Sequence, residues 1–60
     1  MNEKIKELIL KVRATGKTNM LLTSEVQVIA DEMRFYELVI FLEEHRKEYM
    51  NFIMYGDDNN

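Results

Sequence analysis

Cysteine is absent from this 60-residue chain, and histidine occurs once, as His45. The lack of cysteine excludes disulfide bonds and metal sites built on thiolates. A zinc site based on a single histidine would need carboxylate partners. Domains of this size are usually stabilised by disulfides, a metal or oligomerisation, so oligomerisation is the addition that the composition leaves.

Long hydrophobic runs are also missing. The longest run covers five residues, 38–42, whereas a membrane-spanning helix needs about 20. Lysine and glutamate alternate with apolar residues near the start of the chain, which is unlike the unbroken apolar segment of a signal peptide. These features, together with the absence of cysteine, predict a cytoplasmic protein that does not enter a membrane.

An excess of basic residues is missing as well, because 11 acidic and 8 basic side chains give a net charge of −3. Nucleic-acid-binding proteins normally present a basic face to the phosphates, so nucleic acid is not the expected partner. A hydrophobic fraction of 47% beside a charged fraction of 32% is typical of a folded chain. We expect one domain over residues 1–56 and a disordered polar tail over residues 57–60.

The first helix is expected over residues 3–14, with Asn2 as its N-cap and Gly16 at its end. Four apolar side chains repeat there at the spacing of one helical face, namely Ile5, Leu8, Ile9 and Val12. Residues 15–24 are expected to form a polar loop. Its two apolar side chains, Met20 and Leu21, are expected to pack beneath it and close the core. A short helical turn is compatible with this segment.

The second helix is expected over residues 25–33. Ser24 and Gln27 have the spacing of a capping box, in which each side chain bonds a backbone amide of the other residue. Neither proline nor glycine marks its end. A tight turn at residues 33–35 is the preferred interpretation, and one continuous kinked helix is the alternative.

The third helix is expected over residues 35–54, ending at Gly56. Twenty helical residues span about 30 Å, whereas a compact chain of this length has a diameter near 27 Å. The helix would therefore overhang its own domain, and residues 38–42 are apolar on all sides. The prediction is an all-α, three-helix mini-domain with a long C-terminal helix that forms a homodimer. The alternative is a monomer in which the loop at Met20 and Leu21 covers this helix.

The predicted dimer interface consists of the apolar side chains of the long helix. They are Phe35, Leu38, Val39, Ile40, Phe41, Leu42, Tyr49, Phe52 and Ile53.

The usual signs of catalysis or metal binding are incomplete. A general base at His45 would need a nucleophile, and the candidates Ser24 and Thr23 are better explained as helix caps. Di-iron helical bundles use Glu-x-x-His, but Leu42 occupies the glutamate position here. Gly-Lys-Thr at residues 16–18 lacks the upstream glycine and strand of a phosphate-binding loop. We therefore expect neither an enzyme nor a metal or cofactor site.

The second and third helices have the spacing of a helix-turn-helix. A DNA-reading helix should present basic or amide side chains at its start, whereas this one presents Phe35, Tyr36 and Glu37 after Asp31 and Glu32. These carboxylates would repel phosphate, so a DNA-binding regulator is an alternative rather than the preferred function.

An acidic stripe on the third helix predicts binding to a basic surface of another protein. Its members are Glu37, Glu43, Glu44 and Glu48. Methionines supply a second candidate surface, because their flexible side chains adapt to partners as well as filling core gaps. Those most expected to be exposed lie near the C-terminus, at Met50 and Met54 beside Tyr55.

Three stretches, over residues 16–20, 32–39 and 43–49, resemble a small family of unknown function from phages and mobile elements of Gram-positive bacteria. The resemblance extends from about Ile5 to Gly56. It implies an accessory protein of a phage or prophage in the cytoplasm of its bacterial host. Small acidic phage proteins commonly act by binding, so we expect a partner of host or phage origin, for example a host defence protein that is inhibited. A structural or assembly factor is a further alternative.

The resemblance also bears on the turn before the third helix. Family members often carry glycine where this chain has Arg34. This implies a left-handed backbone at Arg34 and favours a break there over a continuous helix.

Overall fold

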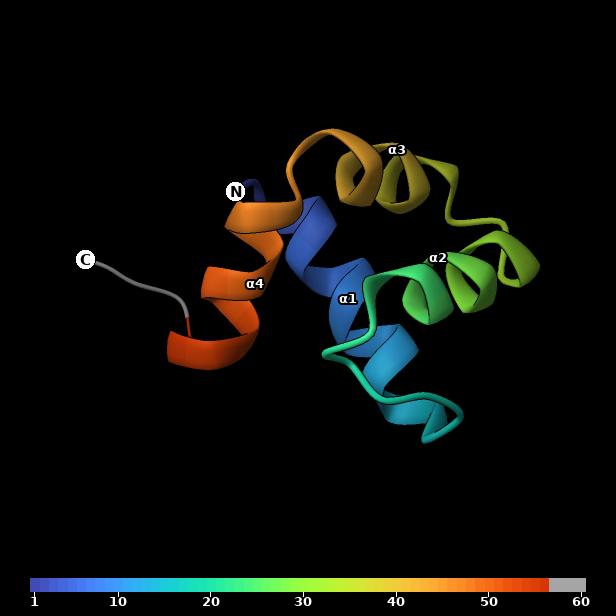
Figure 1. Cartoon of the computed structure of the whole chain (residues 1–60). Coiled ribbons are helices and arrows are strands. Elements are labelled where there is room, and N and C mark those ends of the chain that lie inside the picture. Colours follow the sequence, from blue (N-terminus) through green and yellow to red (C-terminus); the bar gives the residue numbers. More distant parts are fainter. Residues whose placement is uncertain (57–60) are drawn as a thin grey trace.

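Four helices make up the fold in the computed structural model, which describes residues 1–56 (Figure 1). They are α1 (Glu3–Thr15), α2 (Thr23–Glu32), α3 (Tyr36–Glu44) and α4 (Arg46–Tyr55). Since the described part of the chain contains no strand, the all-α prediction is confirmed. The predicted polar tail, residues 57–60, lies outside the described residues.

α1 forms as its sequence predicts. The side chain of Asn2 accepts a hydrogen bond of 2.8 Å from the backbone N–H of Ile5, which satisfies a free donor at the helix start. At the other end Gly16 adopts a left-handed φ of 67° and donates its N–H to the carbonyl of Arg13. The four apolar side chains of the predicted face are all buried.

α2 begins two residues earlier than predicted. The predicted capping box at Ser24 and Gln27 is not formed, so this prediction is wrong. Leu22 occupies the N-cap position, and no side chain bonds the free amides there. The Gln27 amide group instead donates to the carbonyl of Val39 at 3.0 Å and to Oε1 of Glu43 at 3.2 Å. Acceptors on α3, which become available only when the chain folds, have displaced the local cap.

The turn predicted at residues 33–35 is confirmed. Arg34 has a φ of 64°, the only positive value among the described residues other than glycine. The N–H of Phe35 donates to the carbonyl of Ala30 at 2.8 Å, and that of Arg34 donates to Asp31 at 3.0 Å. These two bonds form a Schellman motif, in which the left-handed position is usually glycine.

The prediction of a long C-terminal helix is wrong, and so is the predicted count of three helices. The backbone leaves the helical region at His45, with φ −131° and ψ 48°, and α4 starts at the next residue. A straight helix would have carried Tyr49 about 10 Å beyond Leu42 along its axis, past the end of a small core. The break turns α4 back, and the Tyr49 side chain is fully buried. Burial of this large ring compensates for the lost helical geometry.

The break also removes the overhang that motivated the predicted dimer. The radius of gyration is 10.3 Å, which is close to the ~10 Å expected for a compact chain of 60 residues. α4 continues the helical path in a new direction (Figure 1), and the ion pair between Met1 and Glu48 links it to the start of the chain. The chain therefore does not need a second copy to cover an extended helix.

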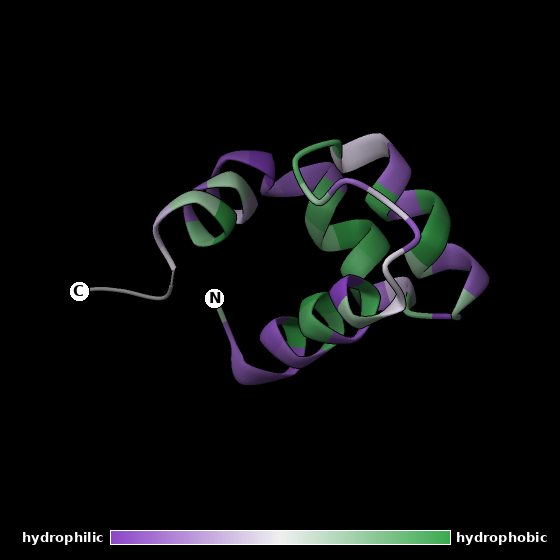
Figure 2. Cartoon of the chain, turned by 90° about the horizontal axis from the view of Figure 1, so that it is seen from below, coloured by the Kyte–Doolittle hydropathy of each residue, from purple (hydrophilic) through white to green (hydrophobic). Residues whose placement is uncertain are grey.

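The hydrophobic core lies between the helices, with apolar residues facing inward and charged residues outward (Figure 2). Among the described residues it consists of Ile5, Leu8, Ile9, Val12, Val26, Ala30, Leu38, Leu42 and Tyr49.

The loop before α2 closes one side of this core. Met20 is half-buried and packs against the core, as predicted, whereas Leu21 is wrongly predicted because half of it is exposed. The hydroxyl of Tyr49 donates a hydrogen bond to the carbonyl of Met20, which joins this loop to α4. The segment contains a turn instead of a helix, closed by a bond of 2.9 Å from Leu22 to Asn19. No helix within residues 1–56 has the length and apolar character to cross a membrane.

Candidate functional site

The solvent-facing side of α3 combines apolar and acidic groups. Tyr36 and Ile40, one helical turn apart, are 56% and 57% exposed. Helical spacing places three exposed carboxylates around them. We call this surface the α3 ridge, and it consists of Tyr36, Glu37, Ile40, Glu43 and Glu44.

The ridge faces outward because the opposite side of α3 supplies the core. Leu38 and Leu42 are fully buried, and Val39 and Phe41 pack partly against the same core. The sequence suggested that residues 38–42 would be buried on all sides. The structure buries or half-buries four of the five, and Ile40 is left facing solvent.

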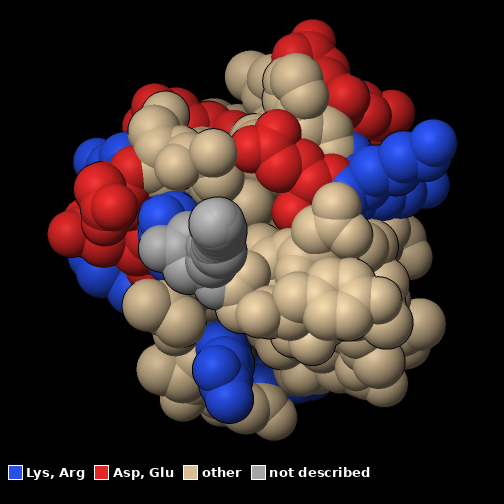
Figure 3. Space-filling model, turned by 90° about the vertical axis from the view of Figure 1, so that its left-hand side faces the viewer, with Lys and Arg blue, Asp and Glu red and all other residues tan. Residues whose placement is uncertain are grey.

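Three of the four glutamates predicted to bind a partner lie on the ridge. Acidic side chains gather along the top of the molecule, the side on which α3 lies (Figure 3). Glu43 accepts the hydrogen bond from Gln27 and is thereby held in place. Glu37 and Glu44 form no ion pair within the described residues, so both carboxylates are available to a basic partner.

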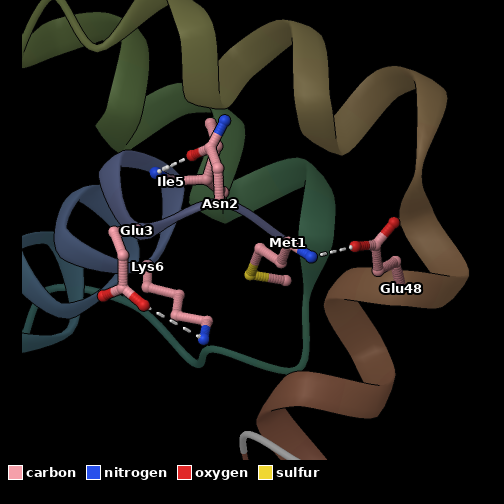
Figure 4. A network of polar contacts seen from close by, with 6 residues as sticks. All are labelled: Met1, Asn2, Glu3, Ile5, Lys6 and Glu48. Atoms are coloured by element: carbon pink, nitrogen blue, oxygen red, sulfur yellow. Dashed lines mark hydrogen bonds and ion pairs between the residues drawn. The ribbon is translucent and has the colours of Figure 1, made fainter.

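Glu48, the fourth predicted glutamate, lies on α4 and is engaged elsewhere. Its carboxylate lies 2.9 Å from the α-amino group of Met1 (Figure 4). The hydrogen bond from this amino group lowers the pKa of Glu48, assisted by the positive charges of the amine and of His45. The pair ties the start of the chain to α4, so Glu48 has an ion-pair partner, which the ridge glutamates lack within the described residues.

The residues predicted to form a dimer interface do not share one exposed surface. Leu38, Leu42 and Tyr49 lie in the chain's own core. Five others are half-buried and pack against this core, namely Phe35, Val39, Phe41, Phe52 and Ile53. Only Ile40 is exposed. A period near seven residues is shared by coiled-coil seams and by helices packed within one chain, so the pattern could not distinguish them.

A groove of about 310 Å³ borders the ridge where α3 begins. Its lining includes Lys4 and Lys11 from α1, and Arg34 from the turn. Glu7 and Glu37 also line it, so its charges are mixed. The lining side chains of α1 follow the i, i+3, i+4, i+7 spacing from Lys4 onward, which places them on one face. The groove links α1 to the start of the ridge.

The candidate catalytic residues are not brought together. His45 lies at the break between α3 and α4, with its ring 5.3 Å from that of Phe41. Ser24 is exposed in the first turn of α2, and no hydrogen bond between them occurs in the described residues. Residues 1–56 contain no cluster of three or more His, Cys, Asp or Glu side chains that could hold a metal ion. In the Gly-Lys-Thr segment at residues 16–18, Gly16 ends α1, and the backbone N–H of Lys17 donates a hydrogen bond of 3.2 Å to the hydroxyl of Thr15.

Residues 1–57, which include all four helices, match the model of a family described as Domain of unknown function (DUF5049). The chain belongs to the DUF5049 family. No curated protein and no solved structure matches it. The expected membership in a family of unknown function is thereby confirmed.

Sequence reasoning missed the role of Tyr49 in this DUF5049 chain. It was assigned to a dimer interface, yet its ring is fully buried and its hydroxyl bonds the Met20 carbonyl. Burial raises the pKa of this phenol to about 12, because the charged phenolate is poorly solvated there. Tyr49 therefore acts as a neutral hydrogen-bond donor that holds α4 against the loop. Its spacing of seven residues from Leu42 indicated a buried stripe, but not which chain would bury it.

Proposed function

We propose that this DUF5049 protein is a non-enzymatic binding protein that engages a basic surface of another protein through the α3 ridge. The observation that carries the proposal is the exposure of Tyr36 and Ile40, each more than half accessible, between three carboxylates. Tyrosine is enriched among the residues that dominate binding energy at interfaces. Charged groups around such anchors mainly determine the association rate and the choice of partner.

The magnitudes fit an interface of modest affinity. Full burial of a large apolar side chain contributes about 1.5–3 kcal/mol. Because Tyr36 and Ile40 are already nearly half-buried, their complete burial by a partner would contribute roughly 1–1.5 kcal/mol each. The carboxylates at the rim add attraction to lysine and arginine that weakens with salt. Binding by the ridge should therefore depend on both apolar anchors and ionic strength.

We further propose that the protein is a phage or prophage accessory factor whose partner belongs to the bacterial host. The support is the resemblance of its sequence to proteins of phages and mobile elements. In the most concrete version, the ridge covers a basic surface of a host defence protein and inhibits it. Occlusion needs no catalytic group in the inhibitor, which agrees with the separation of His45 from the candidate nucleophiles.

A DNA-binding regulator is the second candidate, and one observation favours it. α2, the left-handed turn at Arg34 and α3 follow one another as in a helix-turn-helix. The ridge would then be the surface that faces DNA, and its three carboxylates would lie against the phosphates. Negative charges of the protein next to the negative phosphates oppose binding, so a protein partner is favoured over DNA.

The test compares three tagged proteins as baits in a bacterial lysate. They are the wild type, the double variant Tyr36→Ser with Ile40→Ser, and the control Val28→Ser. Val28 lies on α2 and is 57% exposed, the same fraction as Ile40, so the control removes one comparably exposed apolar side chain outside the ridge. We expect a basic host protein to bind the wild type and the control, and to be lost with the double variant.

Two measurements complete the test. Salt titration should release the captured protein, and Glu37→Gln should weaken its retention. Saturable binding of genomic DNA in a gel shift at low salt would instead establish the regulator. Capture of virion proteins alone would identify an assembly factor, and equal capture by all three baits would refute the role of the ridge.

A further inference from the structure

α4 has a second stripe of side chains, most of which face away from the core, whereas Met50 at its edge is half-buried and packs against the core. Its inner side contains Tyr49, which is fully buried, and Phe52 and Ile53, which pack partly against the core. The outer side carries residues at the i, i+3, i+4, i+7 and i+8 positions of a helix, the spacing of a helix-packing face. We call it the α4 outer stripe, and it consists of Lys47, Met50, Asn51, Met54 and Tyr55.

This stripe exposes large apolar side chains next to a hollow surface. Met54 is 58% exposed and Tyr55 is 77% exposed, the highest value among the large apolar side chains described. A groove of about 440 Å³ lies one to two helical turns away, lined by Arg46, Lys47, Met50 and Asn51. The side of the molecule on which α4 lies shows a broad uncharged surface with both basic and acidic groups at its edges (Figure 3). A protruding aromatic and a groove that could receive it therefore lie on one helix face.

We propose that the α4 outer stripe binds the same stripe of a second copy of the chain, with the two α4 helices antiparallel. In an isologous pair, each surface contacts its own copy, so the groove of one chain receives Tyr55 of the other. Two-fold symmetry through Asn51 places Lys47 of each chain opposite Tyr55 of its partner. The ammonium group can then lie over the phenol ring, a favourable cation–π contact.

Helix electrostatics favour the antiparallel arrangement. The start of a helix carries partial positive charge and its end partial negative charge, so antiparallel neighbours attract. Arg46 and Lys47, which form no ion pair in the described residues, would lie beside the C-terminal end of the other α4. Both charges thereby complement the free carbonyl groups of that end.

Charge also explains why the second copy fits α4 better than the α3 ridge. An isologous contact through the ridge would bring six carboxylates together, three from each chain, and like charges at an interface oppose association. From Tyr49 to Tyr55, α4 has no charged side chain. The proposed dimer therefore leaves both ridges accessible, and its existence does not depend on the function proposed for them.

The size of the surface predicts weak association. A ten-residue helix is about 15 Å long and 10–12 Å wide. One face of such a helix covers an area well under the roughly 800 Å² that each partner buries in a standard interface. The whole chain has an accessible surface of 4122 Å². We expect a dissociation constant on the order of 100 µM, so the dimer forms at high local concentration.

Sedimentation equilibrium from about 10 µM to 1 mM tests the dimer. The wild type should shift from the chain mass of 7.2 kDa toward twice that mass. Met54→Asp with Tyr55→Asp should raise the dissociation constant at least tenfold, because charges would be buried at the interface. The matched control is Tyr36→Asp with Ile40→Asp, which adds the same charge to the ridge and should leave association unchanged. Far-UV circular dichroism checks that both variants keep their helices.

Cross-linking tests the antiparallel geometry. Since the chain contains no cysteine, Asn51→Cys introduces its only thiol next to the two-fold axis, where mild oxidation should form a covalent dimer. Ile40→Cys on the ridge should remain largely monomeric. A 7.2 kDa species at every concentration, or equal loss of association in the ridge control, would overturn the proposal. Preferential cross-linking of Ile40→Cys would overturn it as well.

Discussion

Replacing Arg34 with glycine should stabilise the protein. Arg34 is held at a φ of 64° by the two backbone hydrogen bonds of the Schellman motif. For a residue with a Cβ atom, this left-handed backbone costs roughly 1–2 kcal/mol. Glycine avoids that cost but loses more freedom on folding, which offsets about 0.5–1 kcal/mol. The expected net gain of Arg34→Gly is about 0.5–1 kcal/mol in the free energy of unfolding.

Thermal unfolding followed by circular dichroism provides the measurement. In a domain of this size, 1 kcal/mol changes Tm by about 4–8 °C, so Arg34→Gly should raise it by roughly 2–8 °C. Arg34→Ala is the matched control, because it removes the charge and keeps the Cβ atom. Its stability should remain within about 0.5 kcal/mol of the wild type.

Gly16 offers the reverse substitution. It has nearly the same φ, 67°, and no atom lies within 4 Å of a Cβ placed there. Gly16→Ala should therefore destabilise by about 1 kcal/mol through the backbone alone. If Arg34→Gly were no more stable than Arg34→Ala, backbone strain at Arg34 would not be the cause, and the reasoning would be refuted.

Two further predictions concern the attachment of α4. Tyr49→Phe should lower the free energy of unfolding by about 1–1.5 kcal/mol, because it removes the hydrogen bond to the Met20 carbonyl. Urea denaturation measures this, with the exposed Tyr55→Phe as a control that should show no change. Glu48→Gln should lower stability by less than about 1 kcal/mol, because the Glu48 side chain is 45% exposed. Since the folded pKa of Glu48 is lowered, its contribution is present above the usual 4.5 and is lost as the pH falls below it. An equal difference between variant and wild type at neutral pH and at about pH 3 would contradict this assignment.

Local signals in the sequence were sufficient where the interaction lies within a few residues. Asn2 bonds Ile5 three residues away, and Gly16 ends α1 with a bond to Arg13. The apolar face of α1 follows from helical spacing alone. The interrupted apolar pattern predicts the turn at residues 33–35, and the family resemblance implies the left-handed backbone at Arg34. All of these features are confirmed.

Interactions between residues far apart in the chain could not be predicted from the sequence. The local spacing predicts that Gln27 pairs with Ser24, but its amide group donates to Val39 and Glu43 on α3. The Tyr49 hydroxyl bonds a carbonyl 29 positions away in the chain. A side chain with several possible partners joins the one that the fold brings near, and local spacing cannot reveal it.

For the candidate site, the sequence identified the residue types and the tertiary structure decided their use. The order of apolar and acidic residues in 36–44 placed three glutamates on one side of a helix. Which apolar residue remained exposed depended on how α3 packs, and this left Ile40 beside Tyr36 on the ridge. Glu48 was separated from the other glutamates by the break at His45, and it paired with the Met1 amine.

The sequence by itself determined an all-helical chain, the face of α1 that enters the core, and the turn before α3. These features follow from helical periodicity and from end signals within a few residues. Only the tertiary structure decided that the C-terminal segment is two helices. No proline or glycine marks His45, and the break forms because a bent chain buries Tyr49 whereas a straight helix would hold it in water. The physical reason is that burying the apolar ring of Tyr49 in the core lowers the free energy by more than the loss of helical geometry at one residue raises it.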